Sequence, residues 1–398
     1  MASLTSYEKT NPEPETGRQV DQYLATWLLL YLATTSMRTL ITIRQPGGEP
    51  FPLVIDNDRF GDTDDGPIDD ALDTGRLYAV PGLADSHAHL GMSSMAEMLD
   101  LTDEDLRRNA RRNAWLQVEG GVLLVADKGS GSNATLEILS APPTERPEAF
   151  MAGRVIAPAD GYYAEYGYEV DEDGLVDAVR AVDQRAAWVK IIGDWPRKGI
   201  GPRANYSEAA LAKAVEVAHS AGQKVAIHTM APAGVRSAVD SGVDSIEHGT
   251  FLSGPDLGVL ADRGGVWVPT VLNIEFLLEF LGADSSGGRL MLDGLANLRE
   301  LLPEAERLGV TILAGTDLAV PHGDVAEEAV KLHEYGLSAA AAVTAVSTAA
   351  YDYLGADRRF APGSPANVVF FADDPQDHLV TLRDPQVVIR AGRVVKPD

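Results

Sequence analysis

The chain has 398 residues, of which 45% are apolar and 23% charged, a composition typical of a globular protein with a sizeable core. The 59 aspartates and glutamates outnumber the 33 lysines and arginines, and the formal net charge of −26 disfavours binding to nucleic acid or to anionic membrane surfaces. Cysteine is absent, which excludes disulfides, thiolate metal ligands and cysteine nucleophiles. Any metal ion must therefore be held by histidine, carboxylate or rarer ligands.

The first 36 residues form an extension that we predict to be helical. Its apolar run, residues 23–37, is too short for a comfortable transmembrane helix, and it follows an acidic leader where a secretion signal would have a basic one. We expect this helix to pack on the body of the protein or on a partner subunit, with an atypical export signal as the alternative. The sequence thus favours a cytoplasmic homo-oligomer that does not enter a membrane.

Short extended runs occur at both ends of the chain. Residues 38–44 and 51–56 are separated by the turn residues Pro46, Gly47 and Gly48, and the tail has similar runs at 365–373 and 386–395. Neither end alone has enough strands for a complete fold. We therefore predict that residues 37–81 and 357–398 together form a small β-sandwich domain.

The region between them, residues 82–356, alternates short apolar runs with helical patterns. Eight runs are found, at residues 83–89, 121–127, 149–157, 188–192, 224–228, 244–248, 266–270 and 310–317. Eight strands, each followed by a helix, predict an α/β fold of the (β/α)8 TIM-barrel type. In such a barrel the carboxyl ends of all strands meet at one mouth, so residues that are distant in sequence converge there.

Four histidines and one aspartate lie where these runs end. His87 and His89 are two residues apart, a spacing that places both side chains on one face of an extended strand. Alone, the pair would more often be two packing or surface histidines than a metal site. However, His228, His248 and Asp317 end the fifth, sixth and eighth runs, so all five side chains should face a common point. This arrangement favours a metal site.

Lys190 lies in the middle of the fourth run, where a barrel strand normally carries apolar side chains. A buried lysine is costly unless it is paired or neutralised, and the alternative is a side chain that reaches solvent. A neutral amine can react with carbon dioxide to form a carbamate, whose two oxygens could bridge two cations. Of the other histidines, His322 follows the eighth run and should reach the mouth and contact substrate, whereas we expect packing or solvated roles for His219, His333 and His378.

Several of these motifs together resemble the amidohydrolase superfamily. The resemblance covers residues 38–398, and the motifs occur in the expected order. Within the superfamily the chain is similar to imidazolonepropionase-like and prolidase-like members that carry a lysine on strand four. The motifs are VPGLADSHAHLG (80–91), the lysine of WVKII, the histidine of VAIHT, DSIEHGTFL (244–252), AGTD (314–317), ANVVFFADDP and VIRAGRVV.

The resemblance implies a centre with two divalent metal ions, expected to be zinc, with manganese, cobalt or iron also compatible. A hydroxide bridging the two ions would attack the substrate, and Asp317 would accept its proton and pass it to the leaving group. The implied ligands are His87, His89 and Asp317 for one ion, His228 and His248 for the other, and carboxylated Lys190 as the bridge.

Other parts of the mouth depart from these relatives. The loop at residues 159–170 has Tyr162 and Tyr163 in place of a Gly-Gly-His stretch, and we expect these tyrosines to contact substrate. The second run ends VADKG instead of the usual threonine-valine-arginine-aspartate. The leading hypothesis is a hydrolase that cleaves an amide, cyclic amide, carbamate or peptide-like C–N bond of a small molecule. Alternatives are a single-metal deaminase or hydrolase in which Lys190 is structural, and an inactive metal-binding barrel that acts as a scaffold.

Overall fold

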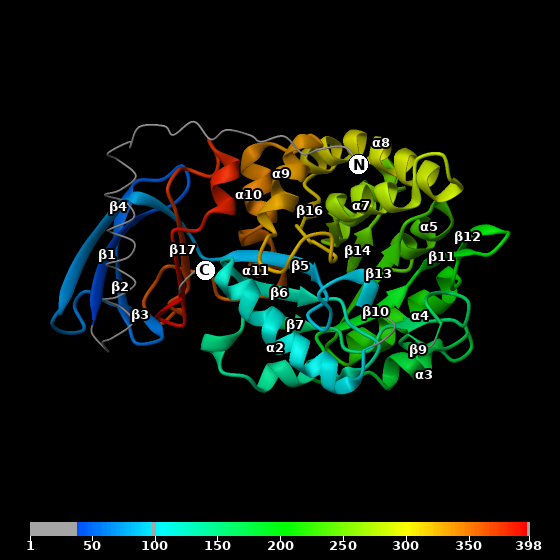
Figure 1. Cartoon of the computed structure of the whole chain (residues 1–398), viewed down its shortest axis with the longest axis horizontal. Helices are drawn as coiled ribbons and strands as arrows, with labels where there is room; N and C mark the ends of the chain where they lie inside the picture. The colour runs from blue at the N-terminus through cyan, green and yellow to red at the C-terminus, as the bar shows by residue number, and fades with distance from the viewer. Residues whose placement is uncertain (1–37, 98–100, 165, 396–398) are drawn as a thin grey trace, which may run out of the picture.

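The computed structural model describes residues 38–97, 101–164 and 166–395 (Figure 1). The predicted N-terminal helix within residues 1–36 lies outside these described residues. A β-sheet lies at one end of the molecule, and a ring of strands surrounded by helices lies at the other. No helix of the described residues is long and apolar enough to cross a membrane.

The eight predicted strands are present and run parallel in chain order. A hydrogen bond of 2.8 Å from Ala187 N to Met151 O joins the third strand to the fourth. Another of 2.8 Å, from Ser86 N to Ala314 O, joins the first strand to the last, so the strands form a closed ring. The prediction of a parallel α/β barrel is thereby confirmed. The strands are β5 (Leu83–Ala88), β6 (Val122–Asp127), β7 (Glu148–Met151), β10 (Trp188–Ile192), β13 (Lys224–Thr229), β14 (Ser245–His248), β15 (Val266–Val268) and β16 (Thr311–Ile312).

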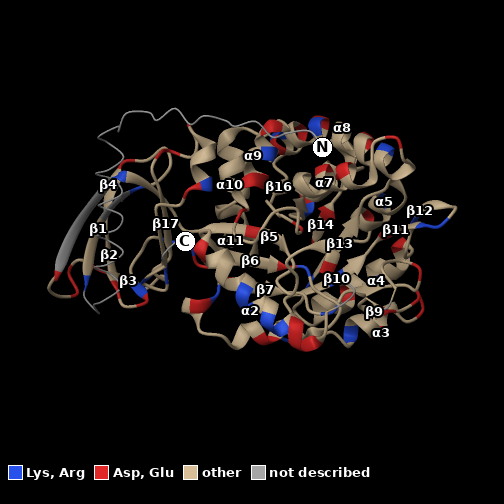
Figure 2. Ribbon diagram, in the orientation of Figure 1, with Lys and Arg blue, Asp and Glu red and all other residues tan. Residues whose placement is uncertain are grey.

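Helices cover the outside of the ring, and each buries one apolar face against it. In α4 (Glu208–Ser220), for example, Leu211, Val215 and Ala218 are buried, and the side chain of Ser207 caps the first turn. Figure 2 shows charged residues of both signs along outer helices such as α2. The others are α2 (Asp103–Glu119), α3 (Leu175–Arg180), α5 (Pro232–Asp240), α6 (Gly254–Arg263), α7 (Val271–Leu281), α8 (Ser286–Leu308), α9 (Ala326–Glu334), α10 (Ala339–Ala345) and α11 (Thr348–Leu354).

The third predicted run, residues 149–157, is not one strand. It divides into β7 and the two-residue β8 (Ile156–Ala157), because Gly153 between them has a φ of +82° and turns the chain. β8 pairs with β9 (Tyr168–Glu169), and a hairpin of β11 (Asp194–Arg197) and β12 (Gly201–Ala204) follows β10. These short elements belong to the loops that surround the barrel mouth.

The two chain ends meet in a seven-stranded sheet with the order β19-β18-β17-β4-β1-β2-β3. Its core joins Ile41 and Phe60 from the head to Phe370 and Ile389 from the tail. A β unit built from both ends is therefore present as a single sheet, while its description as a sandwich and the exact domain boundaries stay predictions. The strands are β1 (Thr39–Arg44), β2 (Pro50–Asp56), β3 (Arg59–Gly61), β4 (Asp70–Val80), β17 (Val368–Phe371), β18 (Val387–Arg390) and β19 (Arg393–Val395).

Candidate metal centre

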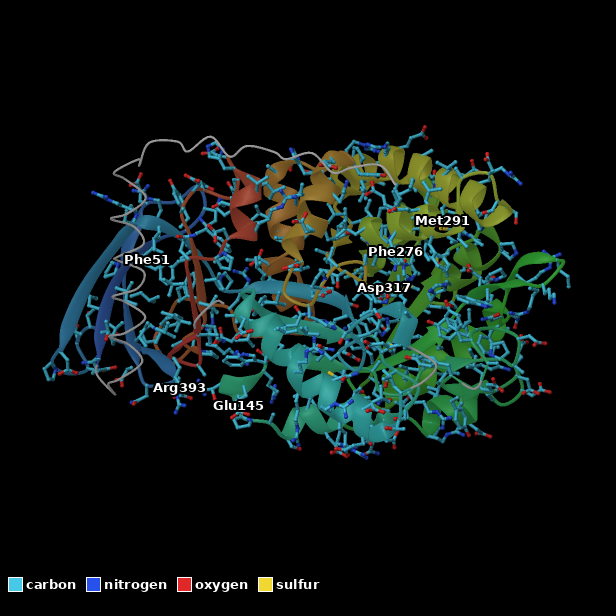
Figure 3. All side chains as sticks on the ribbon, viewed as in Figure 1. Phe51, Glu145, Phe276, Met291, Asp317 and Arg393 are labelled. Atoms are coloured by element: carbon cyan, nitrogen blue, oxygen red, sulfur yellow. The ribbon has the colours of Figure 1, made fainter. Side chains whose placement is uncertain are left out.

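All the predicted ligands line one cavity at the mouth of the barrel. Figure 3 labels Asp317 at this end, with Phe276 of α7 near it in the view. Each ligand lies on a barrel strand or follows its carboxyl end, so the topology alone brings them together. They are His87 and His89 from β5 and the residues just after it, Lys190 from β10, His228 from β13, His248 from β14, and Asp317 from the segment after β16.

The carboxylate of Asp317 lies at the centre of this group. Its Oδ1 is 3.1 Å from Nε2 of His89 and 3.5 Å from Nε2 of His87, and its Oδ2 is 3.8 Å from Nε2 of His248. Ligand atoms about 2.1 Å from a shared tetrahedral ion would lie about 3.4 Å from one another. The donor atoms therefore fit a divalent cation in both type and spacing.

Two of these histidines have their second ring nitrogen fixed by a hydrogen bond. Nδ1 of His89 is 2.6 Å from the carbonyl oxygen of Gly129, which can only accept a hydrogen bond. Nδ1 of His248 is 2.6 Å from Oγ1 of Thr270, whose hydroxyl donates to the Pro269 carbonyl and so accepts from the histidine. Both rings must carry their proton on Nδ1, which leaves the Nε2 lone pair for a metal.

His87 is oriented by a buried carboxylate that the sequence analysis did not identify. Its Nδ1 lies 2.7 Å from Oε2 of Glu247. Oε1 of Glu247 lies 3.1 Å from Nζ of Lys128 and accepts a hydrogen bond from Ser245. Burial alone would raise the pKa of Glu247, but Lys128 and Lys190 outweigh it and hold that pKa below its usual value. Glu247 is therefore ionised, and its negative charge beside Nδ1 favours the His87 tautomer that carries its proton there.

The surroundings keep most of the ring nitrogens neutral. Burial, and then the charge of Lys190, lowers the pKa of His87 well below its usual value, and burial together with His248 does the same for His228. Burial lowers the pKa of His248 to about 3. His89 differs: burial acts to lower its pKa, but the hydrogen bond and charge of Asp317, together with the charge of Asp127, outweigh burial and raise it. Neutral imidazoles are the form that can bind a metal ion.

Lys190 is buried, with 3% of its surface exposed, so the alternative in which its side chain reaches solvent is wrong. Among the described residues its Nζ has no hydrogen-bond partner. Burial lowers its pKa to about 8. The lowered pKa increases the fraction of Lys190 that is a neutral amine near neutral pH, and this is the form that can react with carbon dioxide to give a carbamate.

The backbone at the mouth is held in an unusual conformation. His248, Asp317 and Leu318 have φ values of 65°, 46° and 62°, in the left-handed region that residues other than glycine seldom adopt. The backbone is also closely packed here, because a Cβ on Gly315 would lie 2.6 Å from Cβ of His87. Strain of this kind is stored at functional sites, where the surrounding fold maintains it.

The two predicted substrate-contacting tyrosines line the same cavity. The rings of Tyr162 and Tyr163 lie 4.9 Å apart, and each also contacts Trp195 of β11, at centroid distances of 4.7 and 5.1 Å. Trp195 lies 5.8 Å from the ring of His228. Trp195 was not among the residues predicted from the sequence to contact substrate. An aromatic residue shortly after a barrel strand could have indicated this position, because it must lie near the barrel mouth.

His322 does not join this group, and its predicted contact with substrate needs correction. Its Nε2 lies 2.8 Å from the carbonyl oxygen of Met92, and its Nδ1 lies 3.2 Å from the side-chain nitrogen of Gln117. Since the amide of Gln117 donates to Nδ1, Nε2 of His322 donates to Met92. Both ring nitrogens are therefore used in packing α2 and the loop after β16 together, and neither points into the cavity.

Comparison with known proteins extends these observations. A family model described as "Amidohydrolase family" matches residues 78–395. An uncharacterized protein of Mycobacterium tuberculosis is 29% identical over 337 residues, which cover 80% of this chain and 86% of that protein. The ochratoxinase of Aspergillus niger is 26% identical over 264 residues, or 61% of this chain and 54% of the enzyme.

Solved structures share the fold at lower identity. A Xaa-Pro dipeptidase crystallised with methionine in its active site is 23% identical, with a TM-score of 0.77 over 90% of this chain and 100% of that chain. The A. niger ochratoxinase structure is 20% identical, with a TM-score of 0.76 over 91% of this chain and 96% of that one. The barrel strands, residues 83–312, lie within the residues that the family model matches.

Proposed function

Because the chain belongs to the amidohydrolase family, and so to the enzymes that hydrolyse C–N bonds, we propose that it cleaves an amide, cyclic amide, carbamate or peptide-like bond with the help of divalent metal ions. The observation that carries this proposal is the convergence of four histidines, Asp317 and a buried lysine on one cavity. The donor set contains no sulfur, and it suits zinc while being compatible with manganese, cobalt or iron.

We assign two ions to this cavity. The isolated Nζ of Lys190 supports a bridging carbamate, because its neutral amine can add to carbon dioxide, form an N–C bond and release a proton. Three of the histidines present Nε2 to the centre, as their Nδ1 contacts require. The proposed ligands are His87, His89 and Asp317 for the first ion, His228 and His248 for the second, and Lys190 as the bridge.

When bound, the metals would lower the pKa of a water molecule so that it attacks as a nucleophile, and would polarise the scissile carbonyl. Asp317 would accept a proton from the attacking water and deliver it to the leaving nitrogen. Glu247 would hold His87 in the correct tautomer, and the rings of Tyr162 and Trp195 would restrict the entry of bulk water. In the net reaction the water oxygen bonds to the carbonyl carbon as the C–N bond breaks.

One observation favours the single-metal alternative. The ligand atoms of His87, His248 and Asp317 alone lie within 4.8 Å of one another, which is enough for one ion held without Lys190. Metal content separates the two cases, with two ions per chain in the first and one in the second. An inactive scaffold would show no hydrolysis at either metal content.

The experiment that tests the proposal is Lys190→Ala with chemical rescue. The variant should lose at least one metal ion per chain and most activity, and millimolar propionate should partly restore both by occupying the position of the carbamate. Lys190→Met is the matched control, since its side chain fills the same space and should leave no room for propionate. A fully loaded, fully active Lys190→Ala protein would contradict the bridge and favour the single-metal alternative.

A further inference from the structure

The cavity beside His228 is walled mainly by apolar surface. Apart from the proposed ligands and one asparagine, the described residues that line it have aromatic, aliphatic or thioether side chains. They include Tyr162, Tyr163, Trp195, Ile192, Met230 and Leu277. Sites of this kind bind the apolar body of a ligand and use a few polar groups for orientation.

The cavity offers no cation for an anionic substrate. Among the described residues Lys190 is the only lysine or arginine that lines it, and that lysine is assigned to the metal bridge. Arg197, on the same hairpin as Trp195, instead donates to the carbonyl of Asp160 and to the side chain of Asn205. A substrate carboxylate bound away from the proposed metal ions would be buried in this lining without a cationic partner, which is strongly unfavourable. The net charge of −26 adds long-range repulsion.

The three aromatic side chains form a corner that can hold a ring or a branched alkyl group. Tyr162, Tyr163 and Trp195 meet one another edge to face, with interplanar angles of 63–70°. Burial, and then the neighbouring Tyr166 and Asp317, raises the pKa of Tyr162 well above its usual value, so its hydroxyl stays neutral. Ring contacts of this type add to the free energy gained from burying apolar area.

The entrance is apolar as well. Leu277 of α7 lines the cavity, while Phe276 and Phe280 on the same helix are 40% and 77% exposed, with their rings stacked at 6.5 Å. The side chain of Asn273 in the first turn of α7 donates to the backbone carbonyl of Asp317 over 2.9 Å. This contact places the apolar helix directly beside the metal centre.

We propose that the substrate is uncharged and carries an aryl or branched alkyl group next to the scissile C–N bond, and that Tyr162, Tyr163 and Trp195 bind this group. The inference rests on the proposed function and narrows it. Neutral anilides, aryl carbamates and N-alkyl arylamides fit the cavity, whereas dipeptides and other substrates with a free carboxylate do not. Hydrolysis of the C–N bond gives a carboxylic acid and an amine from an amide, or a carbonic acid monoester and an amine from a carbamate, and Asp317 delivers the proton to the amine.

The test compares two amides of the same shape. N-benzoylglycine carries a carboxylate, and N-isobutylbenzamide replaces that carboxylate with an uncharged isopropyl group. For the zinc-loaded full chain we expect kcat/KM for benzoate release to be at least about a hundredfold higher with the neutral amide, as an unpaired buried charge predicts. Calorimetry on the same protein should give a lower dissociation constant for the neutral amide.

Two variants locate the preference in the cavity. Trp195→Ala should raise KM for N-isobutylbenzamide about tenfold, the typical effect of losing one aromatic contact. KM for N-isobutylacetamide, which lacks the ring, should rise much less, and the metal content should stay the same. Leu277→Arg should add the missing cation and raise kcat/KM for N-benzoylglycine, with Leu277→Met as the control of similar size that should not.

The outcomes separate this inference from the proposed function. Tighter binding or faster cleavage of N-benzoylglycine than of N-isobutylbenzamide would overturn the inference even if hydrolysis is metal-dependent. Equal dissociation constants and equal kcat/KM values for the two amides would also overturn it. The inference also fails if the zinc-loaded protein binds neither amide at millimolar concentration. If the neutral amide binds preferentially but no amide is cleaved at any metal content, the proposed function fails and the assignment of the cavity stands.

Discussion

Replacing Lys128 with methionine should destabilise the protein, because the Glu247 carboxylate would stay buried without its cation. Nζ of Lys128 lies 3.1 Å from Oε1 of Glu247, and 1% and 0% of the two side chains are exposed. The ammonium also lies 3.7 Å from the centre of the Trp188 ring, and methionine cannot replace this cation–π contact. Breaking a buried ion pair by removing one partner costs about 3–5 kcal/mol.

We therefore expect Lys128→Met to lower the free energy of unfolding by about 3–5 kcal/mol, and Glu247→Gln, which strands the lysine, by a similar amount. The double variant contains neither charge, so the two losses should not add. Its free energy of unfolding should exceed the additive value by at least about 2 kcal/mol. Urea unfolding of the metal-free proteins at neutral pH, followed by circular dichroism, measures all four forms.

The affinity for zinc should differ between the Glu247 and Lys128 variants. Glu247 contacts His87 directly, so Glu247→Gln should weaken zinc binding by about 10–100-fold, whereas Lys128→Met keeps the carboxylate and should weaken it less. Arg180→Met, which removes an exposed ion pair with Asp177, is the control and should change stability by less than about 1 kcal/mol. Strictly additive losses in the double variant, or an unchanged stability of Lys128→Met, would refute this reasoning.

Three further variants test other parts of the structure. Asp317→Asn should lower kcat by at least about a hundredfold with an unchanged circular dichroism spectrum, and full turnover would contradict its role in proton transfer. Gly315→Ala should lower the unfolding temperature, because the new methyl group would collide with His87. An unchanged melting curve would mean that the segments carrying Gly315 and His87 can move apart. Burial raises the pKa of Glu328 to about 8, so the folded protein binds this proton more tightly than the unfolded chain does. The free energy of unfolding should therefore fall as the pH rises from about 5 to 8, and Glu328→Gln should flatten that slope in urea titrations.

The barrel was predictable because its strands are buried on both faces, which produces short, continuous apolar runs. All the residues of β5, β6 and β10 are buried, as parallel strands under a layer of helices require. The long strand β4 was not predicted. Its first half reads DALDTG, a sequence without strand propensity, and pairing of residues 70–73 with β1 overrides that local preference.

The ligand positions followed from topology, but the residues that support them did not. A histidine at the end of a strand must face the mouth, and this rule located His228 and His248. The direction of a loop side chain has no such rule, so proximity in sequence placed His322 in the cavity wrongly. Glu247 lies beside His248 in sequence, and the alternation of a strand would place the two side chains on opposite faces. Both nevertheless lie against His87, a contact that exists only in three dimensions.

The segment that carries Asp317 is held by hydrogen bonds to groups that are not proposed to bind metal. The backbone N–H of Asp317 donates to the His87 carbonyl over 2.8 Å, and its own carbonyl accepts from Asn273 over 2.9 Å. Thr316 donates through its hydroxyl to the buried carboxylate of Asp85 over 2.7 Å. These bonds fix the left-handed backbone of Asp317 from both sides through groups that are not proposed to bind metal. The free energy of metal binding is therefore not spent on ordering this segment, and a preorganised carboxylate can serve as both ligand and proton acceptor without moving.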